Sequence, residues 1–257
     1  MKTAILLRGH ARTWNSNKSQ TIEFLDTVYN GPDWYIAMPD TKTVTHNSLH
    51  IDFKNNNFKY CKFTQEQDYQ LPFMSRWQWN SYCIEYWRLA WLDYQLSYAL
   101  RQHELLHNMQ YDQVFFARPD CNYTYQQGRD MTLFANPMEI AIIPNYGVLG
   151  IADQSDPELA DDLSYATGRL AAALIMQRYL DSQWSDLPNS LVHPNPCALF
   201  ASYVAKHSIK IDADKRFIHH ALARPGNLGH TGWAALDLQT KKDLCRDANI
   251  DTIDYQL

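Results

Sequence analysis

Long apolar runs are absent from this sequence of 257 residues. No stretch approaches the roughly 20 apolar residues that a transmembrane helix needs. The first apolar run, residues 4–7, ends at Arg8 and is shorter than the about 7–15 residues of a secretion-signal core. We therefore expect no membrane span, and we interpret the first residues as the opening strand of a domain that begins at residue 1.

Closely spaced cysteines are also lacking. The sequence contains five cysteines, and no two of them form a Cys-x-x-Cys pair. An odd number of widely separated cysteines argues against a structural zinc site and favours reduced thiols. We therefore expect a cytoplasmic protein.

An excess of positive charge and a glycine-rich phosphate loop are missing as well. The formal net charge of −5 gives no bulk attraction to nucleic acid. The absence of a Gly-x-x-x-x-Gly-Lys-Ser/Thr segment disfavours a nucleotidyl- or phosphotransferase. The sequence is instead 46% hydrophobic and rich in aromatic residues, with Trp 8, Tyr 16 and Phe 10. This composition suits a sizeable core and flat, partly wet binding surfaces.

Apolar periodicity predicts an α/β fold. Residues 3–7 and 34–38 are short apolar runs typical of buried strands, and a helical pattern at residues 19–29 lies between them. A strand–helix–strand unit predicts a mostly parallel sheet flanked by helices. We expect a single domain over residues 1–257, with residues 212–257 as a flexible or lid-like extension.

Further elements are expected downstream. A helix over residues 78–107 should turn one stripe of side chains inward: Ile84, Trp87, Trp91, Tyr94, Tyr98 and Leu105. It leads into a central strand at residues 111–117. Further strands are expected at 58–63, 139–143, 146–151 and 209–211, helices at 163–180, at 197–206 and from 240, and a turn-rich basic stretch at 216–230.

Two polar turns follow predicted strands. In an open parallel sheet, ligands bind beyond the carboxyl ends of the strands. In the first turn Gly9 permits close backbone approach, and Arg12 supplies a planar fork for phosphate or carboxylate. The second turn is Arg118-Pro119-Asp120. Asp120 could bind a divalent cation or sugar hydroxyls, or it could form a structural ion pair with Arg118.

The order of these segments resembles a family of GT-A-type glycosyltransferase-like proteins. Typical of that family are a Gly-x-x-Arg-Thr turn after the first strand, here residues 9–13, and a Tyr-Asp-x-Val…Arg-Pro-Asp strand, here residues 111–120. Residues 162–168 and 193–209 extend the resemblance. It implies one Rossmann-related, GT-A-like domain that moves a sugar from a UDP- or GDP-sugar to a glycan or other hydroxyl acceptor.

The resemblance also implies which residues bind the donor. In GT-A enzymes an Asp-x-Asp signature holds Mn²⁺ or Mg²⁺, and here an arginine replaces the first carboxylate. Either Asp120 holds the metal together with His220, or Arg118 itself neutralises the diphosphate. The candidate nucleotide- and donor-binding residues are Gly9, His10, Arg12, Thr13, Arg118, Asp120, Arg216 and Arg224.

For catalysis the resemblance points to a carboxylate upstream of residue 168. Asp162 is the first candidate for the general base that takes the acceptor proton, followed by Asp161 and Asp153, and such a base would give inversion. The alternative role for Asp161 and Asp162 is stabilising a helix N-terminus. An alternative overall function is a catalytically inactive GT-A-like module that binds a carbohydrate or a nucleotide.

Overall fold

The computed structural model describes residues 1–11, 14–39, 44–64, 81–125, 136–142, 164–181, 200, 203–213 and 217–221. The helices are α1 (Trp14–Tyr29), α2 (His46–Asp52), α3 (Ser81–Leu106) and α4 (Arg169–Asp181). The strands are β1 (Thr3–Arg8), β2 (Asp33–Pro39), β3 (Asn57–Thr64), β4 (Gln113–Ala117), β5 (Cys121–Tyr125), β6 (Glu139–Ile142), β7 (Tyr165–Gly168), β8 (Lys210–Ala213) and β9 (Phe217–Ala221).

A seven-stranded sheet in the order β3-β2-β1-β4-β7-β6-β8 forms the centre of the fold. β1 pairs in parallel with β2 on one side and with β4 on the other, and β3 extends the parallel run beyond β2. β7 runs antiparallel to both β4 and β6, and β8 is parallel to β6. The expected mixed α/β fold with a mostly parallel sheet is confirmed.

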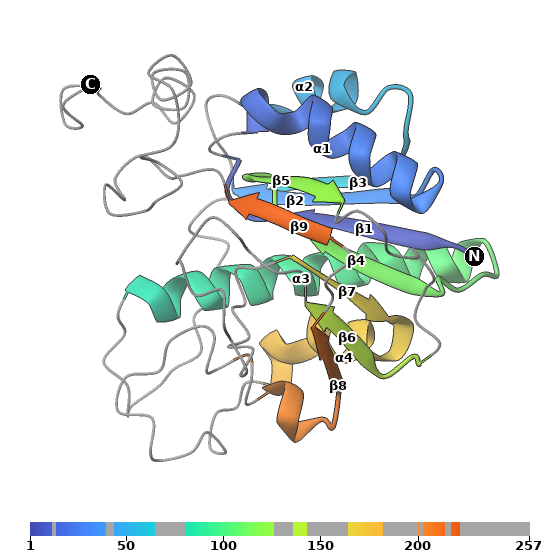
Figure 1. Ribbon diagram of the computed structural model, residues 1–257, viewed down its shortest axis with the longest axis vertical. Helices are drawn as coiled ribbons and strands as arrows, with labels where there is room; N and C mark the ends of the chain where they lie inside the picture. The colour runs from blue at the N-terminus through green and yellow to red at the C-terminus, as the bar shows by residue number, and fades with distance from the viewer. Residues whose placement is uncertain are drawn as a thin grey trace.

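Helices cover both faces of the sheet (Figure 1). Because side chains alternate along a strand, β1 sends Ile5 and Leu7 into a core with α1 and α2, and Ala4 and Leu6 into a core with α3 and α4. β4 divides its side chains in the same way. This burial on both sides explains why the two strands read as continuous apolar runs.

Several predicted elements are confirmed with shifted bounds. The strands expected at 3–7, 34–38, 58–63, 111–117, 139–143 and 209–211 correspond to β1, β2, β3, β4, β6 and β8. Helix α1 begins at Trp14, earlier than expected. Helix α2 was not expected, although Thr45 and Ser48 form a capping box at its start. Within the segment expected as a helix at 197–206, Phe200 and Val204 are buried.

The helix expected at 163–180 was wrong at its beginning. Tyr165–Gly168 is strand β7, and α4 starts only at Arg169. Pairing with both β4 and β6 decides this segment, because it satisfies backbone groups on two sides at a buried position. Gly168 allows the close approach, since an added Cβ would lie 2.5 Å from the carbonyl oxygen of Asn136. On α4, Leu170 is 48% exposed, whereas Ala171 and Ile175 are buried.

Helix α3 is confirmed, but part of its expected inward stripe was wrong. Trp91 is buried, whereas Tyr98 is 67% and Leu105 is 77% exposed. The buried face is instead formed by Ala90, Trp91, Leu92, Asp93, Leu96, Ala99 and Leu100. None of the described helices is both long and apolar enough to cross a membrane.

A two-stranded antiparallel ribbon, β5-β9, forms a separate sheet that lies beside α1 (Figure 1). Neither of its strands was expected, and residues 217–221 were wrongly assigned to a turn-rich stretch. β5 follows Asp120 directly, so the ribbon brings residues 217–221 back to the carboxyl edge of the sheet. The strand expected at 146–151 and the helix expected from 240 lie outside the described residues.

Candidate functional site

The carboxyl ends of β1 and β4 are adjacent, and the sheet grows in opposite directions from this pair. Such a switch point is where open α/β sheets bind ligands. Gly9 follows β1 with a φ of +113°, a left-handed conformation that favours glycine. A Cβ added to Gly9 would lie 3.8 Å from the Cδ of Pro119, so the two predicted turns lie side by side. The predicted residues Arg12 and Thr13 lie outside the described residues, and His10 is half-buried beside Gly9.

Arg118 and Asp120 form a two-pronged ion pair. Nε of Arg118 donates to Oδ1 of Asp120 at 2.6 Å, and Nη2 donates to Oδ2 at 2.5 Å. Arg118 is 9% exposed and Asp120 is 2% exposed. Parallel N–H···O bonds of this kind fix the orientation of the guanidinium. The ion pair was one of the two alternatives left open by the sequence.

Side chains from α1 hold this turn in place. The Nδ2 group of Asn17 donates to the carbonyl oxygens of Pro119 and Cys121 at 3.0 and 3.1 Å. Thr21 donates its hydroxyl to the same Cys121 carbonyl at 2.9 Å. The amide N–H of Arg118 donates to the hydroxyl of Tyr123 at 3.0 Å. The backbone on both sides of Pro119 is therefore fixed by buried hydrogen bonds.

Tyr123 links the turn to β7. Its hydroxyl lies 2.6 Å from Oγ of Ser164, and both residues are buried. Burial raises the pKa of Tyr123 strongly, so the hydroxyl stays protonated and neutral. Asp162, Asp161 and Asp153 lie outside the described residues; in sequence, Asp162 precedes Ser164 by two residues. Because α4 begins only at Arg169, its first turn contains neither Asp161 nor Asp162, so α4 gives no support to their alternative role.

The ribbon places two other predicted residues differently. His220 on β9 pairs with Asn122, and Ala221 pairs with Cys121, directly after Asp120. Phe217 pairs with Tyr125 at the far end of the ribbon. Arg216 and Arg224 lie outside the described residues; in sequence, Arg224 follows the near end of β9 and Arg216 precedes the far end.

The described donor groups at the turn do not fit a divalent cation. Its one carboxylate, Asp120, already has both oxygens bound to the Arg118 guanidinium. Among the residues that the structure describes, no group of three or more His, Cys, Asp or Glu side chains is arranged to hold a metal ion. Hard cations such as Mg²⁺ prefer several oxygen ligands.

A buried network of charges lies on the other side of β1, and the sequence did not indicate it. Asp93 on α3 accepts from Arg8 at 2.8 Å and from Arg178 at 2.7 Å. The side chains of all three are 0% exposed. Arg8 also donates to the hydroxyl of Tyr165 at 3.1 Å. The inward stripe expected for α3 did not include Asp93, so the apolar periodicity carried no signal for the network.

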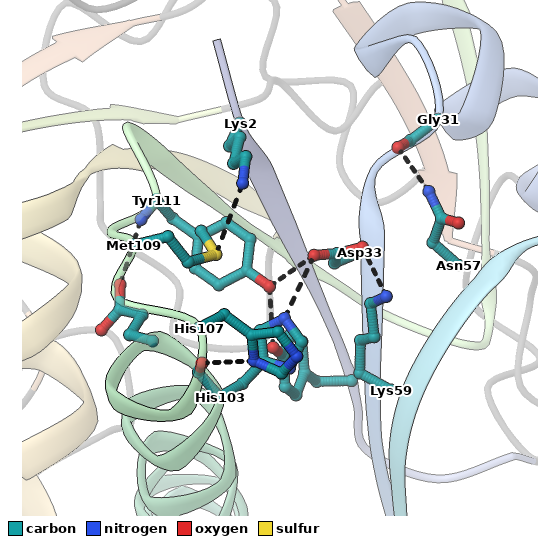
Figure 2. Close-up of polar contacts among 11 residues, drawn as sticks. Lys2, Gly31, Asp33, Asn57, Lys59, His103, His107, Met109 and Tyr111 are labelled. Atoms are coloured by element: carbon teal, nitrogen blue, oxygen red, sulfur yellow. Dashed lines mark hydrogen bonds and ion pairs between the residues drawn. The ribbon is translucent and has the colours of Figure 1, made fainter.

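Tyr111 of the central motif precedes the amino end of β4, opposite the two turns, and lies among polar side chains (Figure 2). Tyr111 donates its hydroxyl to Oδ2 of Asp33 at 2.6 Å, and Lys59 lies 3.4 Å from the other oxygen. His103 is 3.8 Å from the same carboxylate. Burial lowers the pKa of His103, and the neighbouring His107 lowers it further.

This second cluster therefore joins α3 to the amino ends of β2, β3 and β4. Its position at the amino ends of these strands, opposite the switch point, indicates a structural role.

No model of a known protein family matches the chain, and no curated protein matches it significantly. Solved glycosyltransferases resemble it at low identity. The apo-form glycosyltransferase GlyE of Streptococcus pneumoniae is 9% identical, with a TM-score of 0.47 over 98% of this chain and 61% of that one. TarS of S. aureus in complex with UDP-GlcNAc is 12% identical, with a TM-score of 0.44 over 96% of this chain and 66% of that one.

The galactosyltransferase LgtC, solved with donor and acceptor sugar analogues, is 8% identical, with a TM-score of 0.40 over 96% of this chain and 95% of that one. The chain thus spans about three fifths of the length of GlyE. Because these identities are so low, the chain's own residues must carry the functional argument.

Proposed function

We propose that this protein transfers a sugar from a nucleotide-sugar donor to the hydroxyl group of a glycan or similar acceptor. One observation carries the proposal: the Gly9 turn and the Arg118-Pro119-Asp120 turn, far apart in sequence, meet at the switch point of the parallel sheet. Ligands bind at this place in such sheets. The two turns are also the segments through which the sequence resembles GT-A-type glycosyltransferases.

The proposed reaction breaks the bond between the anomeric carbon of the sugar and the diphosphate oxygen. The electron pair of that bond stays on the diphosphate, the acceptor oxygen bonds to the anomeric carbon, and the acceptor proton passes to a base. Asp162 is the first candidate for that base, with Asp161 and Asp153 after it. A carboxylate base acting directly on the acceptor would invert the anomeric centre.

The donor side is proposed from the same turns. Backbone near Gly9 would approach the nucleotide closely, and Arg118 would lie next to the diphosphate. Arg12, Thr13 and His10 are proposed to complete the nucleotide pocket. Arg216 and Arg224 are proposed to contact the diphosphate from the chain around β9.

A catalytically inactive binding module is the second candidate. The buried Arg118–Asp120 pair favours it, because the only carboxylate described at this turn is already neutralised. Such a module would bind the nucleotide or the sugar at the same switch point without cleaving the donor.

The test is release of nucleotide from a panel of UDP- and GDP-sugars, with water or simple sugars as acceptors. Slow release that disappears in Asp120→Ala and persists in Asp112→Asn would support a transferase. Asp112 is the matched control, because it is exposed and lies at the other end of β4. Saturable nucleotide binding without turnover of any donor would favour the binding module. No saturable nucleotide binding would refute the transferase and the nucleotide-binding form of the module.

A further inference from the structure

The leaving diphosphate of the proposed reaction needs a positive charge beside it. Negative charge develops on the diphosphate oxygen as the bond to the sugar breaks, and a preorganised cation stabilises that charge. A divalent metal and a guanidinium can both serve. The inference below rests on the proposed function, because it names the source of this charge.

The geometry points to Arg118 as the cation in the place that a metal occupies in an Asp-x-Asp site, with Asp120 as its positioning residue. Asp120 binds Nε and Nη2 of one guanidinium through both carboxylate oxygens, at 2.6 and 2.5 Å. A cation held in this way keeps one orientation. No solvent or side-chain rearrangement is then needed when charge develops on the diphosphate.

Buried hydrogen bonds also fix the backbone that carries Arg118. Its amide donates to Tyr123, which is joined to Ser164 directly before β7, while Asn17 holds the carbonyls on either side of the turn. All these partners are buried. A loop that must open to receive a hydrated metal would not need such a frame, whereas a preorganised cation does.

Using Asp120 as a metal ligand would work against this arrangement. The carboxylate would have to give up two charge-assisted hydrogen bonds at a position that is 2% exposed. The guanidinium would then face a divalent cation of like charge at short range. Both effects favour the arginine over the metal.

Binding of UDP and of GDP by titration calorimetry, in EDTA and then in Mn²⁺ or Mg²⁺, tests this inference. We expect affinity to change less than about threefold between these conditions. Arg118→Ala should weaken binding by about 10- to 100-fold, the range for hydrogen bonds to charged groups. Arg118→Lys should restore only part of the loss, because lysine lacks the planar fork.

Two further variants separate the roles. The double variant Arg118→Ala/Asp120→Ala removes both charges together, so it guards against misfolding from a buried unpaired carboxylate. It should bind as weakly as the single variant. Asp120→Asn should keep nucleotide affinity within about threefold but lower turnover about tenfold or more, since the guanidinium loses its orientation. Arg101→Ala, on the exposed face of α3, is the matched control and should change nothing.

The outcomes distinguish this inference from the proposed function. Nucleotide binding that requires Mn²⁺ and is lost in Asp120→Asn would overturn the inference and leave the transferase standing. Metal-independent binding that Arg118→Ala does not weaken would also overturn it. A wild-type protein that binds neither nucleotide under any condition would remove the proposed function, and the inference with it.

Discussion

Replacing Asp93 by alanine should strongly destabilise the protein. The Asp93 carboxylate lies between two guanidinium groups, at 2.8 Å from Arg8 and 2.7 Å from Arg178, and none of the three side chains is exposed. Removing it would leave two buried cations without the carboxylate that both contact. Breaking a buried ion pair in this way costs about 3–5 kcal/mol. That is a large part of the about 5–15 kcal/mol by which native proteins are stable.

Urea denaturation followed by tryptophan fluorescence measures this loss. With a urea dependence of about 3 kcal/mol per molar, a loss of this size lowers the midpoint by about 1–1.7 M. Lys210→Ala is the contrast, because Lys210 pairs with Glu139 at the surface and is 65% exposed. Lys210→Ala should lower the free energy of unfolding by less than about 1 kcal/mol.

The result that refutes the reasoning is a small loss in the aspartate variant. If Asp93→Ala and Lys210→Ala both cost less than about 1 kcal/mol, the network is not a dehydrated cluster of charges. Asp93→Asn adds a check on the cause. Asparagine keeps the size of the side chain but not its charge. Asp93→Asn should therefore lose nearly as much free energy of unfolding as Asp93→Ala.

Three other changes test further features of the fold. Gly168→Ala should cost about 1–3 kcal/mol in urea unfolding, because its Cβ would lie 2.5 Å from backbone; a neutral result would contradict the packing of β7. Leu96→Ala should lower the free energy of unfolding by about 2–5 kcal/mol, because Leu96 is buried. Leu105→Ser should change it by no more than about 0.5 kcal/mol, because Leu105 is exposed. Equal losses would contradict this burial and favour the inward stripe expected from the sequence. The pKa of His103 is lowered in the folded protein, so its contribution to stability is complete above about pH 6.5 and lost as the pH falls through the folded-state pKa. His103→Gln should reduce the dependence of the free energy of unfolding on pH between about pH 5 and 8. An unchanged slope would exclude His103 as the source of that pH dependence.

Elements with strong local signals were predictable, whereas β5, β7 and β9 were not. Short apolar runs predicted β1, β2 and β4, because the composition of strands buried on both faces distinguishes them from loops. β7 carries a sequence compatible with a helix, and its strand state comes from pairing with β4 and β6. β5 and β9 support each other across nearly a hundred residues of sequence, a contact that no local pattern contains.

The buried charges illustrate the same limit. Asp93 lies between Leu92 and Leu96 on the inward side of α3, where a sequence pattern predicts apolar residues. Its presence there depends on Arg8 and Arg178, which come from a different strand and a different helix. Only the assembled sheet brings the three together, so the sequence could not indicate that the charges compensate one another.

The sequence by itself determined the α/β class, the parallel pairing at the centre, and the two polar turns that follow β1 and β4. These features depend on short-range patterns: apolar runs, a glycine that tolerates a left-handed backbone, and a proline that ends a strand. Only the tertiary structure decided that the turns meet, that Asp120 binds Arg118 in a buried pair, and that Tyr123 ties them to β7. Such contacts join segments distant along the chain, and their geometry depends on how the whole sheet is assembled.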